Sequence, residues 1–396
     1  MAISISTDLI SIITFYALIF LYLFYKRKRI TTQKLGRIPV AFFLKTQSGV
    51  GALRRLGTKY ERFWKSFGYA AIPIGFVGLV SGLIFLTAEL VRIITTPQAT
   101  AGIGLVLPGV RIPGSSIFVP FWYGIIALFI VLIVHEGAHG VVAEAWKLKI
   151  KNAGVGMFAI IPFAFVEPNE AKLKKSKIKT QLSVFAAGPF ANLVAALIAF
   201  LVMTFLLAPA SAQALEPTGI YIDSVDPGFP ADLAGLPADV IINKVDDRTI
   251  TASTDFLEYM ATISPGQTVT LSSDDQDFEI TTVENPTNTS KAFLGVKFRQ
   301  NTIVKPSLQE SYGNLPLLLI YASRLFYWIF MLNIGIGIIN LLPLGPIDGG
   351  RMADLALRSV IKDKKVAAKT YTIITTFSAA LLLFNILAPI LLSFTL

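Results

Sequence analysis

Two histidines and a glutamate lie within five consecutive residues, His135, Glu136 and His139 of the segment HEGAH. On an α-helix, residues i and i+4 share one face about a turn apart, so both imidazole rings can reach one metal ion with the glutamate beside it. The chain has no other histidine and no cysteine, so only nitrogen and oxygen atoms can bind the metal. The spacing predicts a zinc-dependent hydrolase.

A catalytic zinc ion takes three protein ligands and one water molecule, so one ligand must come from elsewhere in the chain. It must be a carboxylate, and we expect Asp348, which follows a stretch rich in proline and glycine at the end of an apolar segment. Glu144 is out of phase with His135 on the helix and should face away. Glu167 and Glu170 flank five lysines, with which they are expected to form solvated ion pairs.

Glu136 is better suited to act as a general base than as a ligand. Zinc lowers the pKa of its bound water, and an adjacent carboxylate can accept the proton as the water attacks a carbonyl. An amide such as that of Asn192 or Asn340 would help to stabilise the oxyanion that develops. The predicted reaction is peptide-bond hydrolysis with one Zn²⁺ per chain.

The elements that carry these residues are predicted to lie in a membrane. Of the 396 residues 54% are hydrophobic and only 15% are charged, which indicates a polytopic α-helical membrane protein. Ionisable groups cost several kcal/mol in hydrocarbon unless something compensates them, so their presence in an apolar segment favours a functional site. We expect six spans, at residues 9–25, 69–91, 119–146, 182–208, 315–342 and 370–394.

Charge is divided unevenly along the chain. Residues 215–300 hold 14 of the 25 acidic residues but only 5 of the 35 basic ones, which is typical of a solvated domain. The basic clusters elsewhere adjoin apolar spans, so they predict cytoplasmic loops of a cell-membrane protein and give no reason to expect nucleic-acid binding. With this orientation both termini and the acidic domain lie outside the cell, and the metal site lies toward the cytoplasmic side of the bilayer.

Five parts are predicted. The first two spans and their loops occupy 1–118, and the catalytic core is split between 119–208 and 315–351. A small α+β domain occupies 215–300, and a cytoplasmic loop with the last span occupies 352–396. Within the core, residues 152–169 are apolar but interrupted by glycine and proline, which favours two short strands or a re-entrant loop over a spanning helix.

Three motifs in this order resemble the site-2 protease family of intramembrane metalloproteases: His135-Glu136-x-x-His139, Gly188-Pro189-x-x-Asn192 and Asn340-x-x-Pro343-x-x-x-x-Asp348-Gly349. The resemblance implies zinc held by the two histidines and Asp348, Glu136 as general base, and the two asparagines as polar assistants. It also implies membrane-anchored substrates, namely single-span proteins already trimmed outside the membrane.

Two further resemblances concern substrate binding. Residues 215–300 are similar to the PDZ domains inserted at this place in the family, which implies a loop for a peptide terminus at Gly219, Ile220, Tyr221 and Ile222. Gly154-Val155-Gly156 resembles the start of the family's membrane-re-entrant hairpin. This implies that an unwound substrate adds as a strand near Gly154, Gly156 and Phe158.

Two other functions use the same residues. A metal-ion or proton transporter could relay its cargo through His135, His139 and Asp348, but it would have no use for Glu136 or a peptide-binding domain. An inactive scaffold that binds membrane peptides would not need a complete set of ligands and a base.

Overall fold

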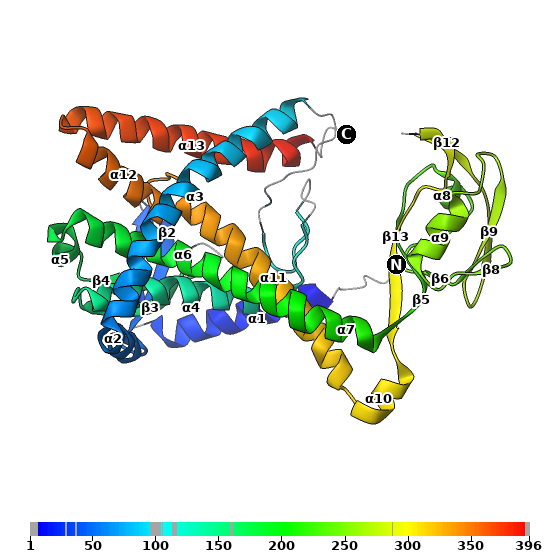
Figure 1. Ribbon diagram of the computed structural model, residues 1–396, viewed down its shortest axis with the longest axis horizontal. Coiled ribbons are helices and arrows are strands. Elements are labelled where there is room, and N and C mark those ends of the chain that lie inside the picture. Colours follow the sequence, from blue (N-terminus) through cyan, green and yellow to red (C-terminus); the bar gives the residue numbers. More distant parts are fainter. Residues whose placement is uncertain are drawn as a thin grey trace. The chain divides into compact units, whose positions relative to one another are not determined.

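A computed structural model of the chain describes residues 7–27, 30–35, 38–95, 104, 106–112, 117–158, 161–286 and 288–392. The chain forms two compact units (Figure 1): unit 1 comprises Met1–Met203 and Arg324–Leu396, and unit 2 comprises Thr204–Ser323. Most of the predicted catalytic core belongs to unit 1, and residues 204–208 and 315–323 belong to unit 2.

Six helices among the described residues are long and apolar enough to cross a membrane. The protein is therefore a polytopic, mainly helical membrane protein, as the sequence predicts. The helices are α1 (Thr7–Tyr25), α3 (Glu61–Thr95), α4 (Phe121–Ala145), α6 (Ile178–Val202), α11 (Leu315–Leu341) and α13 (Lys364–Leu392). Beyond α6 the chain continues through a π-helical turn, Met203–Leu207, into α7 (Ala208–Ala214).

Four strands form an antiparallel sheet in unit 1, in the order β1 (Ile30–Leu35), β2 (Ile38–Thr46), β3 (Ile150–Phe158) and β4 (Ile161–Pro168). The last two are the pair of strands expected within 152–169, and their connection at 159–160 lies outside the described residues. Residues 26–68 were expected to be a loop, but they contain β1, β2, α2 (Val50–Lys59) and the first turns of α3. Pairing of β2 with a strand so far along the chain leaves little local signal in the sequence.

Helix α4 lies against α2, α3 and α6, and small residues let these helices approach closely. Buried alanines on α4 and α6 form much of this core: Ala127, Ala138, Ala186, Ala187 and Ala191. On α3, Gly78 and Gly82 contact Leu341 and Leu342, so the second span supports the segment that leads to Asp348.

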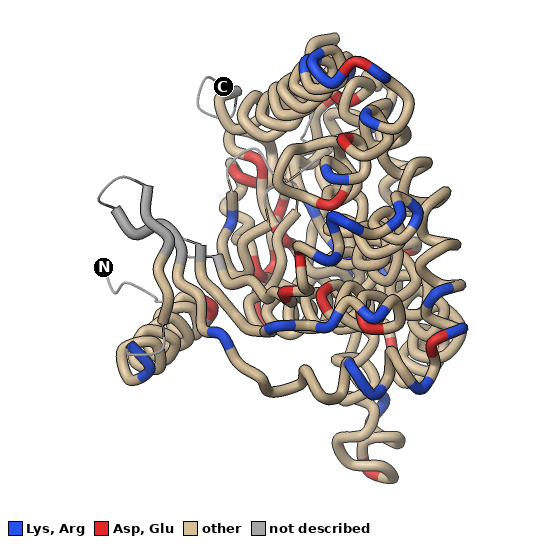
Figure 2. The backbone as a smooth tube through the Cα atoms, turned by 90° about the vertical axis from the view of Figure 1, so that its left-hand side faces the viewer, with Lys and Arg blue, Asp and Glu red and all other residues tan. Residues whose placement is uncertain are grey.

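Lysine and arginine gather at one end of unit 1. This end carries α2, α5 (Glu170–Lys175) and the turn between α12 (Asp348–Val360) and α13; it lies to the left in Figure 1 and faces the viewer in Figure 2. Unit 1 thus has one strongly basic end, as expected of a membrane protein whose basic loops lie on one side.

Unit 2 is a small α+β domain with one apolar core. Its core side chains alternate along the strands, as in β9, β10 and the middle of β5, where one face is buried. Its strands are β5 (Leu215–Val225), β6 (Ile241–Ile242), β7 (Lys244–Val245), β8 (Arg248–Thr249), β9 (Thr268–Ser272), β10 (Asp277–Thr281), β11 (Val283–Asn285), β12 (Asn288–Phe293) and β13 (Val296–Val304). Its helices are α7, α8 (Pro230–Leu233), α9 (Ser253–Met260) and α10 (Pro306–Tyr312), and it also includes the first turns of α11.

The segment expected as a peptide-terminus loop is an interior strand. Gly219, Ile220, Tyr221 and Ile222 lie in β5, between β13 and β6. Gly219 N–H donates to the Thr251 carbonyl. The N–H of Ile222 likewise donates to the Val240 carbonyl. These backbone groups are used within the fold, and the outer strands of this sheet are β13 and β6.

Candidate metal centre

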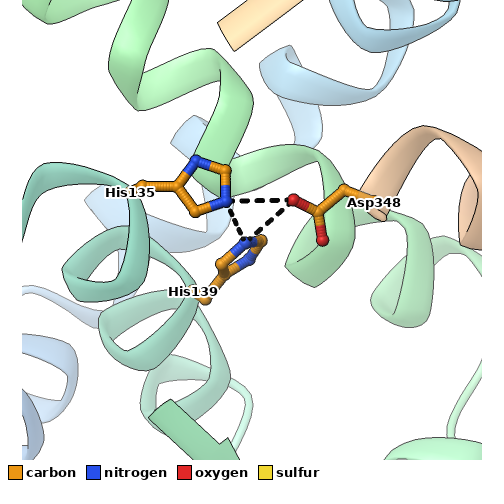
Figure 3. A group of neighbouring side chains, drawn as sticks. All are labelled: His135, His139 and Asp348. Atoms are coloured by element: carbon orange, nitrogen blue, oxygen red, sulfur yellow. Dashed lines mark hydrogen bonds and ion pairs between the residues drawn. The ribbon is translucent and has the colours of Figure 1, made fainter. Parts of the chain in front are cut away.

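His135 and His139 lie one turn apart on α4, and their rings point to the same place (Figure 3). Asp348, from the first turn of α12, points to this place from the other side. His135 is 7% exposed and Asp348 is 9% exposed, so two of the three side chains are almost completely buried. The three residues that the sequence predicts as metal ligands therefore meet in one cluster.

Three atoms face one another in this cluster. His135 Nε2 lies 3.1 Å from Asp348 Oδ2, and His139 Nε2 lies 3.2 Å from each of them. A tetrahedral zinc ion with bonds of about 2.0–2.1 Å separates its ligand atoms by about 3.3 Å. The spacing of the three atoms therefore fits a zinc ion with a fourth position left open.

The protonation of His139 gives a second test of this fit. Its Nδ1 lies 2.7 Å from the carbonyl oxygen of Val184, which can only accept a hydrogen bond, so Nδ1 carries the proton. In the neutral ring Nε2 then presents a lone pair to the Asp348 carboxylate and to the His135 ring. Three acceptor atoms directed at one point form a stable arrangement with a cation between them, and two imidazoles with one carboxylate suit Zn²⁺.

Helix α6 positions both histidines with three residues spaced four apart. Val184 accepts from His139, and Gly188 leaves room for the same ring, because a Cβ atom there would overlap His139 Nε2. Pro189 has no N–H to donate to the carbonyl of Phe185, four residues earlier in α6. No residue pattern pointed to Val184 or to a role for Gly188, although both lie one or two turns before Asn192.

Asn192 is the third of these residues and lies against His135. It is completely buried, and its Nδ2 is 3.1 Å from His135 Nδ1. Its Oδ1 has no hydrogen-bond partner among the described residues. If His135 binds a metal through Nε2, Nδ1 carries a proton, and a half-turn of the amide brings Oδ1 to accept it. Asn192 contacts the side of the ring that faces away from the cluster.

The break between α11 and α12 brings Asp348 to the cluster. Pro343 cannot continue α11, and a short turn leads to the start of α12. A Cβ atom at Gly349 or Gly350 would overlap the carbonyl oxygens of Leu341 and Leu344, so only glycine lets the new helix begin so close to the old one. A carboxylate in the first turn also interacts favourably with the helix dipole.

Helix α13 supplies hydrogen bonds that this turn lacks. Thr375 Oγ1 donates to the Pro343 carbonyl over 3.0 Å, and Tyr371 OH donates to the Gly345 carbonyl over a long 3.5 Å. Carbonyl groups that leave a helix at membrane depth need such partners, because no water is available there. Thr375 and Tyr371 lie in the sixth span, outside the three motifs, where no residue pattern indicates a contact with this turn.

Glu136, next to His135 on α4, is held by the sheet. The backbone N–H of Val166 in β4 donates to Glu136 Oε2 over 2.9 Å. The structure records no hydrogen bond to Oε1 within its described residues. One oxygen of the carboxylate is therefore fixed and the other is available to a small molecule.

The remaining predicted residues lie elsewhere. Asn340 donates from Nδ2 to the Ile336 carbonyl of its own helix and is not joined to the cluster by a recorded contact. Glu144 accepts from Ile150 N–H and pairs with Arg54. Glu167 pairs with Lys45, and Glu170 pairs with Lys174. The competing acids are thus used in other contacts, whereas the role of Asn340 stays a prediction.

Gly154, Gly156 and Phe158 lie in β3, which pairs with β2 on one edge and β4 on the other. A side chain at Gly154 or Gly156 would overlap the rings of Phe165 or Phe163, which cross over from β4. The two glycines therefore make room for aromatic rings, and the edge strands of this sheet are β1 and β4.

Comparison with known proteins finds a family match that covers most of the chain. A sequence profile of peptidase family M50 matches residues 123–385, well over half of the chain, and this range includes the histidines and Asp348. An uncharacterised protein of Methanocaldococcus jannaschii is 27% identical over 326 residues, which cover 81% of this chain and 79% of that protein.

Two solved structures resemble a part of the chain. The PDZ domain of an SdrC-like protein of Listeria monocytogenes matches 20% of this chain and 87% of its own, with 23% identity and a TM-score of 0.18. The corresponding PDZ domain of Listeria innocua matches 21% of this chain and 96% of its own, with 21% identity and a TM-score of 0.18.

Proposed function

The chain belongs to peptidase family M50, the site-2 protease family, and we propose that it is an intramembrane zinc metalloprotease that hydrolyses peptide bonds of single-span membrane proteins. The strongest support is the meeting of His135, His139 and Asp348 at distances that suit a zinc ion, in a protein with six candidate spans. Family M50 consists of zinc-dependent proteases, so the expected cofactor is Zn²⁺.

The chemistry follows from the groups around this cluster. When bound by His135, His139 and Asp348, Zn²⁺ would supply a polarised water molecule and a Lewis acid for the scissile carbonyl. Glu136 would take the water proton on Oε1, because Oε2 already accepts from the sheet. Asn192 would keep the His135 ring in place, which is a positioning role and differs from the direct oxyanion contact first expected of it.

The substrate would bind as an extended strand. A helical span hides its carbonyls in hydrogen bonds, so it must unwind before hydrolysis, and an open strand edge replaces the lost bonds. The outer strand β4 lies beside α4 and contacts Glu136, which makes its edge the suitable one. Substrates trimmed outside the membrane would have the mobility that unwinding needs.

We further propose that the basic end of unit 1 is cytoplasmic and that unit 2 lies outside the cell. The gathering of lysine and arginine at one end supports this orientation (Figure 2). A peptide end would pair with β13, the outer strand beside α9. Deletion of residues 215–300 distinguishes two roles of unit 2. If unit 2 excludes untrimmed substrates, the shortened chain should cleave them. If unit 2 binds the ends of trimmed substrates, the shortened chain should no longer cleave these.

The proposed function is tested by measuring zinc content and cleavage of a single-span test peptide in detergent. The wild type should hold one zinc and cleave the peptide. Glu136→Gln should keep the metal and lose activity by about 10²–10⁴-fold. Asp348→Ala should lose both the metal and activity.

Other results would redirect the assignment. Full zinc and activity in Asp348→Ala would show that another group is the third ligand. Cleavage that survives Glu136→Gln would exclude it as the base. Metal binding by all variants without cleavage, together with metal flux into vesicles, would favour a transporter.

A further inference from the structure

The Glu136 carboxylate is joined to the sheet through a backbone group. Val166 N–H donates to its Oε2 over 2.9 Å. A backbone N–H within a paired strand cannot swing as a side chain does, so it fixes the carboxylate more firmly than an exposed side-chain donor would. The position of the carboxylate therefore depends on the position of β4.

The hydrogen bond also shows which way the backbone of β4 faces. In an antiparallel strand, alternate residues direct N–H and C=O to opposite edges. Strand β4 has β3 on one edge only, and Val166 pairs in register with Ala153 of β3 while its N–H points to Glu136. The backbone N–H and C=O of Val166 therefore point to the open edge, and so do those of Ala164, two residues before it.

The open edge of β4 has few donors. Pro162, which also faces it, and Pro168, which ends the strand, have no N–H, and the N–H of Val166 is used by Glu136. Within the described part of the chain no partner is recorded for Ala164 N–H. Ala164 therefore offers the edge's one unused donor, about 7 Å along the strand from Val166.

We propose that Val166 is a positioning residue, whose N–H holds Glu136 at the edge of β4 where the substrate strand is added. This inference rests on the proposed protease function and deepens it. One strand then sets the place of both reactants: Ala164 would anchor the substrate backbone, and Val166 would hold the base next to the bond to be cleaved. The scissile bond should lie within about two residues of the one that pairs with Ala164.

The test compares two prolines two residues apart on the same edge. Val166→Pro removes the N–H that Glu136 uses, and Ala164→Pro removes the free one. Neither N–H belongs to the ladder with β3, and proline is tolerated at such edge positions. Val166→Ala and Ala164→Ser keep the N–H and serve as matched controls, which matters because the Val166 side chain lies near Gly140.

We expect the two prolines to affect different kinetic constants. Val166→Pro should lower kcat about 10–100-fold relative to Val166→Ala with KM within about threefold, because a base displaced by about 1 Å loses much of its effect. Ala164→Pro should mainly raise KM relative to Ala164→Ser. In a Glu136→Gln background, binding of the test peptide should survive Val166→Pro and weaken with Ala164→Pro, which gives a readout that does not require turnover.

A second variant removes the same donor without a ring. Replacing Val166 by its α-hydroxy acid turns the peptide between Phe165 and Val166 into an ester, which deletes the N–H, adds no ring and makes the Phe165 carbonyl a weaker acceptor. It should reproduce the kcat loss while zinc content stays at the wild-type level. The inference is wrong if the ester variant keeps the kcat of wild type, or if both prolines change only KM. The proposed function fails separately, if zinc-loaded wild type does not cleave the peptide.

Discussion

Both histidines of the metal centre have one ring nitrogen in contact with α6. His139 Nδ1 donates to the Val184 carbonyl, and His135 Nδ1 lies against the amide of Asn192. Such partners fix the tautomer and the orientation of a ligating ring, and their loss typically costs 10–100-fold in metal affinity or activity. The Val184 carbonyl cannot be removed by mutation of a side chain, but the Asn192 amide can.

Asn192→Leu should therefore weaken zinc affinity by roughly 10–100-fold, measured by competition with a chelator. Asn192→Asp keeps an acceptor for His135 Nδ1–H and should retain most of that affinity. Asn340→Leu is a suitable control, because Asn340 bonds within its own helix, and zinc affinity should not change. If Asn192→Leu lowers kcat but leaves zinc affinity intact, Asn192 acts on the oxyanion instead of the ring.

At the scale of elements, Asp348 is placed by the contacts of two other spans. α3 brings glycines against Leu341 and Leu342, and α13 donates from Thr375 to the Pro343 carbonyl. The turn before α12 contains carbonyl groups that accept no hydrogen bond within a helix, so the Thr375 donor helps to hold the turn in one shape. Spans outside the three motifs thus help to place the third ligand.

Thr375→Val, which has nearly the same shape, should lower stability by about 1–3 kcal/mol, because it leaves the Pro343 carbonyl buried and unsatisfied. It should also weaken zinc binding, since the turn that carries Asp348 loosens. Thr375→Ser should restore both properties. The control is Thr372→Val one turn earlier, where the hydroxyl donates to its own helix at an exposed position. Equal effects of the two valine substitutions would show that Thr375 has no particular role in the turn.

A pH dependence is expected for α9 in unit 2. Asp255 Oδ2 accepts from the N–H of Ala252 and from the N–H and hydroxyl of Thr251. These bonds, that of Ala252 foremost, hold the pKa of Asp255 below its ordinary value. Because the folded pKa is the lower one, the cap stabilises α9 above the unfolded pKa, about 3.9, and this stabilisation is lost as the pH falls through the folded pKa.

Amide hydrogen exchange in α9 measures this effect. At pH 6 exchange should be slower in the wild type than in Asp255→Ala, and the difference should shrink as the pH falls below about 4. Comparing the wild type with Asp255→Ala at the same pH removes the intrinsic pH dependence of amide exchange. A difference that stays constant down to pH 2 would mean that protonation of Asp255 leaves the cap intact.

The sequence predicts the spans and the ligands better than it predicts the sheets. Apolar runs and the His135, His139 and Asp348 motifs are local signals, and the structure brings these residues together. Strand β2 was missed because its partner β3 lies more than a hundred residues later, and β1 pairs only with β2. The interior position of Gly219 in β5 and the contact of Val166 with Glu136 likewise depend on pairing that no local pattern records.

At the scale of the whole molecule, the orientation in the membrane decides whether the metal centre lies nearer the cytoplasmic or the outer face of the bilayer. The absence of cysteine makes the chain well suited to single-cysteine labelling, since each introduced thiol is the only one. Ser359 is exposed at the basic end of unit 1, and Thr289 is exposed on β12 of unit 2. Neither residue belongs to the metal centre.

In intact cells, a membrane-impermeant maleimide should label Thr289→Cys and leave Ser359→Cys unlabelled until the membrane is opened. This follows because basic loops stay on the cytoplasmic side, and one candidate span of the described chain, α11, lies between Thr289 and Ser359. The reverse pattern would invert the orientation, so that unit 2 would meet cytoplasmic peptides, while the metal centre and the role of β4 would be unaffected. Labelling of both positions in intact cells would place them on the same side of the membrane. It would contradict a crossing by α11, the one candidate span among the described residues that lies between Thr289 and Ser359.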